Sequence, residues 1–133
     1  MNPSTLAPLT NDTQLLRRAS DLVGRATRRQ LWLMFLDSSD MQSPVLLPTD
    51  IPARPGSRDA GPFSTFIEEI VKAVECAAIV VVLERPGPEG LSDDDLSWLA
   101  LLRDSTALAG VELRTTLLSH SSGVVLVGSD QLQ

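Results

Sequence analysis

Residues that could carry out chemistry are sparse in this sequence. It has one cysteine, Cys76, and one histidine, His120, so a Ser-His-Asp or Cys-His arrangement would have to use these single copies. Cys76 lies between a helical pattern and an apolar run, which favours a small buried hydrophobe over a reactive thiol. His120 falls in a predicted turn between strands, which favours a surface residue over a general base. We do not expect the two side chains to be neighbours.

An acidic run, Asp93–Asp95, follows Ser92 and could indicate a Mg²⁺ or Ca²⁺ site. Three consecutive acids on a helix point in different directions, however, and acids in the first helical turn are favoured by the helix dipole alone. Ser92, three residues before Asp95, is a typical N-cap. The glycines show no phosphate-loop spacing. We therefore interpret this stretch as the beginning of a helix, and we expect no metal and no cofactor.

The composition excludes several further functions. A chain of 133 residues suits one domain with a real core, which we place at 11–130 after a flexible tail at 1–10. The net charge of −6 disfavours nucleic-acid binding, and a single cysteine excludes an intramolecular disulfide. No apolar run reaches the roughly 20 residues of a membrane helix, and the N-terminus lacks the pattern of a signal peptide. We expect a cytoplasmic protein without membrane contacts.

Three helices are predicted from apolar residues at helical spacing, at about 11–26, 65–75 and 93–109. Thr10 or Asn11 can cap the first helix, and Ser64 or Thr65 the second. Five arginines lie largely off the apolar stripe of the first helix: Arg17, Arg18, Arg25, Arg28 and Arg29. We interpret them as a solvated face, with an acidic partner as the alternative.

Strands are predicted from two kinds of pattern. The continuously apolar runs 31–36 and 77–83 are typical of central strands covered on both faces. The first run should form a hairpin with 42–48, and the segment 111–127 should form a second hairpin. The Pro-rich stretch 48–62 should be a long surface loop. The order is therefore α-β-β-α-β-α-β-β, an α/β fold with one mixed sheet of about five strands sandwiched by helices.

The block from Phe66 to Gly128 resembles the RadC-type branch of the JAB/MPN (JAMM) domains. In that branch a helix leads into an apolar strand that ends in His-x-His-Pro-Ser-Gly, and Ser-x-x-Asp then opens the next helix. The corresponding residues here are Val82-Leu-Glu-Arg-Pro-Gly87 and Leu91-Ser-Asp-Asp-Asp95, followed by Ala109-Gly-Val111 and a hairpin. The N-terminal helix and the strand 31–36 with its return strand fit too. The resemblance implies a JAB/MPN-like fold with cytidine-deaminase-like layering, and a bacterial source.

The most diagnostic family residues have changed in this chain. The two His ligands of the family fall on Leu83 and Arg85, neither of which can bind zinc. The third ligand matches Asp95, and the family serine matches Ser92. The loop between them is one residue shorter than usual, and the catalytic glutamate has no counterpart, since 42–50 holds only Asp50 as an acid. The chain thus keeps at most one ligand, whereas a catalytic zinc needs about three.

The resemblance and its departures together predict a metal-free domain that is no longer an enzyme. We expect a protein-interaction or self-associating module, with its contact at an apolar patch or at a sheet edge such as strand 111–119 or hairpin 31–48. The alternative is an enzyme or small-ligand binder that uses the remodelled pocket around Leu83, Arg85, Ser92 and Asp95. A further hypothesis is that Arg85 replaces the cation and pairs with Asp95, which would close the former site.

Overall fold

The computed structural model describes residues 8–56 and 60–127 of the chain. Its elements follow one another in the order α-β-β-α-β-α-β-β: α1 (Asp12–Leu22), β1 (Gln30–Leu36), β2 (Gln42–Asp50), α2 (Ala60–Val74), β3 (Ala78–Glu84), α3 (Asp93–Ala109), β4 (Glu112–His120) and β5 (Gly123–Leu126). The five strands form one open sheet in the order β2-β1-β3-β4-β5. Only the β3–β4 pair is parallel, so the sheet is mixed. The predicted α/β class is confirmed.

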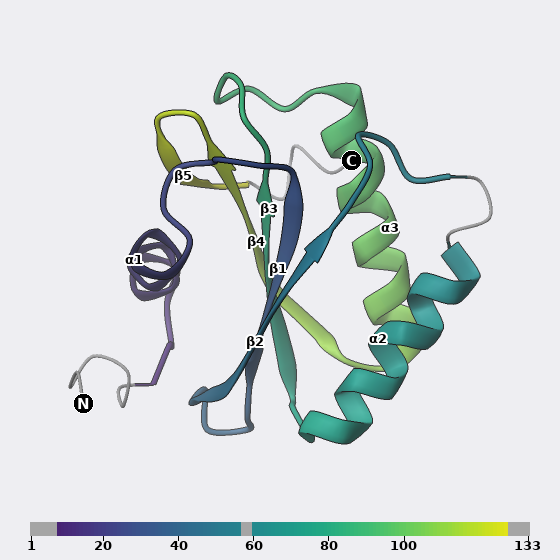
Figure 1. The fold of residues 1–133 in the computed structure, drawn as a ribbon. Coiled ribbons are helices and arrows are strands. Elements are labelled where there is room, and N and C mark those ends of the chain that lie inside the picture. The colour runs from purple at the N-terminus through teal and green to yellow at the C-terminus, as the bar shows by residue number, and fades with distance from the viewer. Residues whose placement is uncertain (1–7, 57–59, 128–133) are drawn as a thin grey trace.

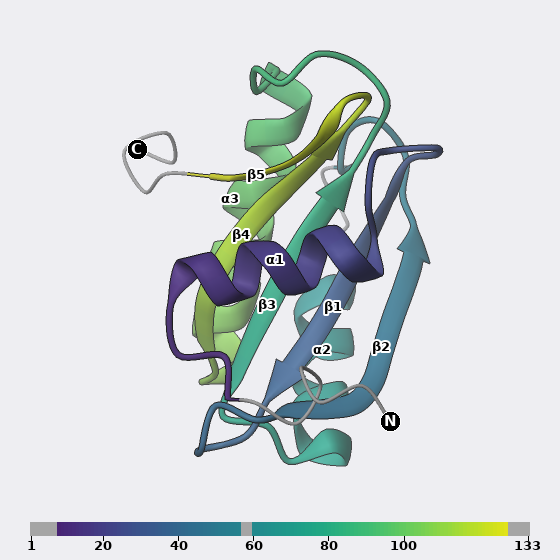
Figure 2. The same cartoon turned by 90° about the vertical axis from the view of Figure 1, so that its left-hand side faces the viewer.

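Helices cover both faces of this sheet. Helix α1 lies across one face, and α2 and α3 lie on the other (Figures 1 and 2). The two central strands, β1 and β3, are apolar at successive positions because alternate side chains point to opposite faces. Odd-numbered residues such as Leu33 and Val81 pack in the core under α2 and α3. Even-numbered residues such as Met34 and Val80 pack under α1.

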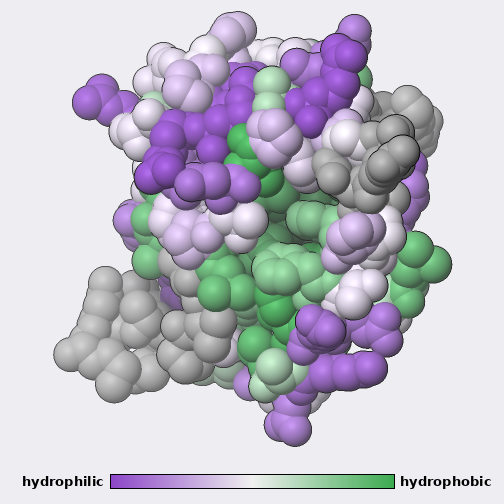
Figure 3. Space-filling view, turned by 45° about the vertical axis from the view of Figure 1, so that its right-hand side comes forward, coloured by the Kyte–Doolittle hydropathy of each residue, from purple (hydrophilic) through white to green (hydrophobic). Residues whose placement is uncertain are grey.

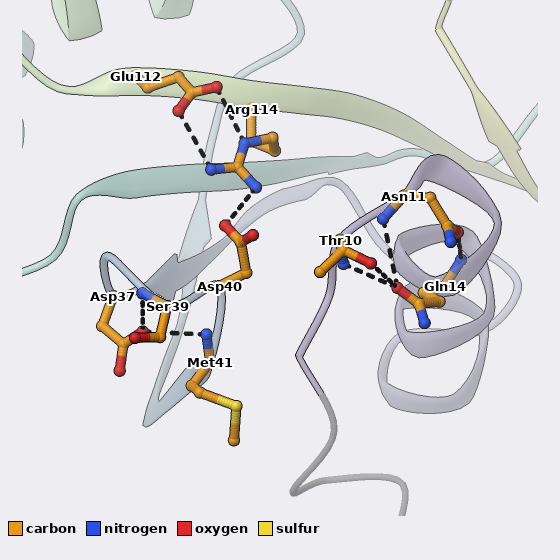
Figure 4. Close-up of polar contacts among 9 residues, drawn as sticks. All are labelled: Thr10, Asn11, Gln14, Asp37, Ser39, Asp40, Met41, Glu112 and Arg114. Atoms are coloured by element: carbon orange, nitrogen blue, oxygen red, sulfur yellow. Dashed lines mark hydrogen bonds and ion pairs between the residues drawn. The ribbon is translucent and has the colours of Figure 1, made fainter.

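The first helix is shorter than predicted. Its N-cap is Asn11, whose side chain accepts from the backbone of Gln14, but it ends at Leu22 and the chain turns at Gly24 with φ +69° (Figure 4 shows the N-cap). Arg25, Arg28 and Arg29 therefore lie beyond the helix. The apolar stripe misled the prediction because the following residues continue the same spacing.

Two other predictions about the N-terminal region are wrong. Arg18 is buried and not on a solvated face, and its guanidinium donates to the Gln42 side chain. The predicted tail 1–10 includes Leu9, which is buried and whose N–H donates to the Asp40 carbonyl at 2.8 Å. The packed region thus includes Leu9, while residues 1–7 lie outside the described part of the chain.

The region between β2 and α2 also differs from the prediction. Strand β2 continues to Asp50, and α2 begins at Ala60, before the predicted caps Ser64 and Thr65. The Thr65 hydroxyl instead donates to the Gly61 carbonyl within the helix. The loop is therefore shorter than the expected 48–62 at both ends. At the α2 end the reason is that proline is tolerated in the first turn of a helix, as at Pro62.

Strand β4 is an interior strand. It pairs with β3 on one side and with β5 on the other, so it is not the free edge suggested for a partner. Its last five residues are all buried, in place of the predicted alternation. At its other end, Arg114 bridges Glu112 and Asp40 of the β1–β2 turn, with N–O distances of 2.9 and 2.7 Å (Figure 4).

Candidate functional site

The four residues singled out by the resemblance meet where β3 ends and α3 begins. Leu83 is the penultimate residue of β3 and is fully buried. Arg85 follows the strand directly, with a side chain that is 4% exposed. Ser92 is the N-cap of α3 and Asp95 is its third residue, with a side chain that is 1% exposed. The β3–α3–β4 connection thus brings Arg85 against the first turn of the helix.

A capping box fixes the beginning of α3. The Asp95 N–H donates to the Ser92 hydroxyl at 3.1 Å, and the Ser92 N–H donates to Asp95 Oδ2 at 2.9 Å. Two backbone donors that have no partner within the helix are satisfied in this way. The interpretation of Ser92 and Asp95 as a helix cap is confirmed.

Arg85 donates to the same carboxylate. Its Nε lies 3.3 Å from Asp95 Oδ1 and 3.1 Å from Oδ2, and its Nη2 lies 2.9 Å from Oδ2. The predicted contact between Arg85 and Asp95 is therefore present. Because the pair is buried, its attraction is screened by water far less than that of a surface ion pair.

The rest of the Arg85 guanidinium holds the loop that connects β3 to α3. Nη1 donates to the Pro88 carbonyl at 2.5 Å, and Nη2 donates to the Gly90 carbonyl at 2.8 Å. Gly87, with φ +129°, allows the chain to turn between Arg85 and Pro88. The loop is also tied to the β4–β5 turn, since the Gly87 N–H donates to the Ser121 hydroxyl at 2.7 Å. Every nitrogen of the guanidinium thus has an internal acceptor.

These contacts set the protonation of Asp95. Burial raises the pKa of the Asp95 carboxyl, but the hydrogen bonds and charge of Arg85 and the hydrogen bonds of Ser92 outweigh burial, so the pKa lies below its ordinary value. Asp95 is therefore an anion paired with a permanent cation. The charge of the carboxylate is therefore balanced within the chain.

A second buried charge, Glu84, lies on the opposite face of the same strand end. Its carboxylate accepts from Thr27 N–H at 2.8 Å, Gln30 Nε2 at 2.7 Å and Trp32 Nε1 at 2.8 Å. Burial raises the pKa of Glu84. These hydrogen bonds, with one from the Arg28 N–H, lower the pKa by more than burial raises it, so the pKa lies below its ordinary value. Glu84 fixes the connection between α1 and β1 to the end of β3.

The sequence analysis missed the role of Glu84 because its partners are distant in the chain. The only signal was a charged residue at the end of an otherwise apolar strand, and that pattern is equally typical of a residue entering solvent. Its donors come from the segment between the first predicted helix and the first predicted strand, and from that strand. The burial of Glu84 could therefore not be derived without the position of that connection.

The single histidine and cysteine do not form a site. His120 ends β4 and is buried, which corrects its predicted place in a surface turn, and its Nδ1 accepts from the Ser122 N–H at 3.2 Å. Cys76 is half-buried just before β3, and burial raises the pKa of its thiol above the ordinary value despite a backbone hydrogen bond. Because β3 and β4 are parallel, Cys76 and His120 lie at opposite ends of the sheet, so the prediction that they are not neighbours is confirmed.

The described residues contain no group of three His, Cys, Asp or Glu side chains that could hold a metal ion. The acidic run at the start of α3 is divided among different partners. Asp95 binds Arg85, whereas Asp94 accepts from Arg54 Nε at 2.9 Å. No helix among these residues is both long and apolar enough to cross a membrane.

The surface is hollowed away from Arg85 and Asp95. One hollow, called the apolar hollow below, has a volume of about 300 Å³. It lies between the end of β2, the first half of α2 and one residue of α3, and it is lined by Thr49, Asp50, Ile51, Pro52, Pro62, Phe63, Phe66 and Trp98. Figure 3 shows apolar residues gathered in a depression on this side, with hydrophilic residues around it.

A second hollow of about 250 Å³ lies between the β3–α3 loop and the β4–β5 hairpin, lined by residues that include Gly90, Leu118 and Val125. None of Leu83, Arg85, Ser92 and Asp95 lines either hollow. The Arg85 side chain and its hydrogen-bond partners lie between the end of β3 and the first turn of α3.

Comparison with protein-family models and with curated proteins gives no significant match for this chain. The resemblance to RadC-type JAB/MPN domains consequently depends on the residues quoted above and stays a prediction.

Proposed function

We propose that this chain is a non-catalytic, metal-free interaction domain of JAB/MPN-like architecture. The observation that carries the proposal is the buried Arg85–Asp95 pair, which occupies the position that the resemblance gives to a metal and its ligands. The guanidinium supplies a fixed positive charge and binds the carboxylate through two nitrogens. A domain that keeps the strand, loop and helix around this position, but has the Arg85 side chain where a metal would be, is suited to binding another protein.

The alternative function, an enzyme or a small-ligand binder at these residues, requires an open pocket there. Arg85 and Asp95 are 4% and 1% exposed, and their polar atoms are engaged with each other, with the loop carbonyls or with the helix cap. The geometry therefore supports a binding module over chemistry at this position.

Metal analysis of the purified full chain, combined with its mass in solution by light scattering, tests the proposal. We expect less than stoichiometric zinc and no change in melting temperature when zinc or a chelator is added. A monomer would indicate a different protein as partner, and a dimer would indicate self-association. One zinc per chain would contradict the proposal.

A further inference from the structure

We propose that the apolar hollow receives an apolar anchor side chain, flanked by lysine or arginine, from a different protein. This inference rests on the proposed function and names the surface and the kind of partner. It follows from the walls of the hollow, from the neighbouring sheet edge and from the charges at the rim.

The walls of the hollow are aromatic. The chain has three phenylalanines, two tryptophans and no tyrosine, and three of these side chains line the hollow. The Phe63 ring lies 6.1 Å from Phe66 and 6.2 Å from Trp98, centroid to centroid. Trp98 is 3% exposed and its indole N–H already donates to the Pro52 carbonyl at 3.0 Å, so the indole forms a buried apolar wall with no free donor. Aromatic pockets of this kind are where interfaces place their dominant side chains.

The adjacent sheet edge is unsuited to pairing with another strand. Strand β2 is the edge strand of the sheet beside the hollow, and it contains Pro44 and Pro48. Proline has no N–H to donate, and it occurs in sheets mainly where an edge is left unpaired. A partner therefore gains little from adding a strand here, and side-chain insertion into the hollow is the contact that remains.

The charge at the rim is negative. Glu69 lies next to Phe66 on the surface of α2, because residues three apart are neighbours on a helix. It is exposed and forms no ion pair with the described residues, whereas Asp50, which lines the hollow, is paired with Arg28. With a net charge of −6, two copies of the chain repel each other, and a basic partner is attracted.

Selection from a random phage-displayed peptide library on the wild-type chain tests this inference. We expect the recovered peptides to share one aromatic or leucine residue with lysine or arginine beside it. Synthetic copies of these peptides should bind Phe66→Ser at least about tenfold more weakly, as at a binding hot spot. Glu69→Lys, a surface change that leaves the hollow intact, should weaken binding and reduce its salt dependence.

Leu108→Ser is the matched control, since Leu108 is an apolar residue of α3 that is 77% exposed. It lies ten positions beyond Trp98, about 15 Å along the helix, and its substitution should leave binding unchanged. Circular dichroism checks that each variant is folded.

Three results would overturn the inference: no enrichment of peptides, enrichment of acidic peptides, or equal binding to Phe66→Ser. A wild-type dimer that Phe66→Ser converts to monomers would identify a second copy as the occupant and would also overturn it. All four results leave the proposed function standing, because that function fails on stoichiometric zinc, which is measured separately.

Discussion

Asp95 and Trp98 are one turn apart in α3 and belong to two contrasting regions. Asp95 forms a closed polar site with Arg85, in which both side chains are buried and bonded within the chain. Trp98 forms part of the apolar hollow, which is open and whose aromatic side chains have no polar atom left to satisfy. The same helix therefore supports one region whose polar groups are bonded within the chain and one that we propose to receive a partner.

The difference separates stability from binding. Substitution in the closed polar site leaves a buried charge without its partner, so its effect should appear in the free energy of unfolding. Substitution of Phe66 in the hollow removes a side chain that is only half-buried, so its effect should appear mainly in binding. The substitutions and the pH series below test this separation, from the largest expected effect on stability to the smallest.

Asp95→Ala should have the largest effect. It leaves Arg85 as an unpaired buried cation and removes half of the capping box, which is expected to lower the free energy of unfolding by about 3–5 kcal/mol. Urea denaturation measures this value. The control is Asp94→Ala, which removes an ion pair whose arginine is 73% exposed and should cost below about 1 kcal/mol, apart from a small dipole contribution. Equal costs for the two variants would show that the buried pair is not a major source of stability.

Glu84→Gln should have an intermediate effect. The amide keeps the shape of the carboxylate but replaces one acceptor with a donor that faces the Thr27, Gln30 or Trp32 donors. Losing hydrogen bonds to a buried charge should cost about 1.5–3 kcal/mol. The exposed Glu89→Gln is the control and should be nearly neutral. A neutral Glu84→Gln would mean that the connection between α1 and β1 is not held by this carboxylate.

The pH dependence of stability should report both buried carboxylates. The pKa values of Asp95 and Glu84 are lower in the folded chain than their ordinary values, so each group contributes stability above its unfolded pKa and loses it as the pH falls through the folded pKa. The free energy of unfolding should be level near neutrality and decrease below about pH 4. The combined Asp95→Asn and Glu84→Gln variant should show a shallower decrease, and parallel curves would contradict the assignment.

Phe66→Ser should have the smallest effect on stability. Phe66 is half-buried beside the hollow, so its removal should cost about 1 kcal/mol, roughly half the value of a fully buried side chain. The next residue, Ile67, is fully buried, and Ile67→Ala should cost about 2–5 kcal/mol. Similar losses for the two would mean that Phe66 belongs to the core and that the hollow is a structural feature alone.

The sequence was sufficient for the features that depend on local pattern. The apolar strands 31–36 and 77–83, the cap formed by Ser92 and Asp95, and the contact of Arg85 with Asp95 could all be predicted. Each depends on residues that are close in sequence or on a regular period, and such signals are strong.

The features that could not be predicted depend on distant contacts. The burial of Arg18 and His120 and the interior place of β4 are fixed by packing against other elements. The end of α1 at Leu22 differs, because Gly24 is a local stop signal that the continuing apolar spacing concealed. The apolar hollow is the clearest case, because Phe63 and Trp98 belong to different helices and meet only where α2 packs against α3. The order of strands in the sheet decides which apolar side chains stay uncovered.

Introducing two histidines tests the central proposal, that Arg85 stands where the resemblance places a metal. Leu83 and Arg85 are two positions apart at the end of a strand and share a face, and Arg85 already contacts Asp95. The variant with Leu83→His and Arg85→His should therefore present His, His and Asp to a zinc ion. We expect the folded double variant to bind one zinc per chain and to melt at a higher temperature with zinc than without, whereas the wild type should bind none. A folded double variant that fails to bind zinc, or a wild type that binds it equally, would contradict the claim.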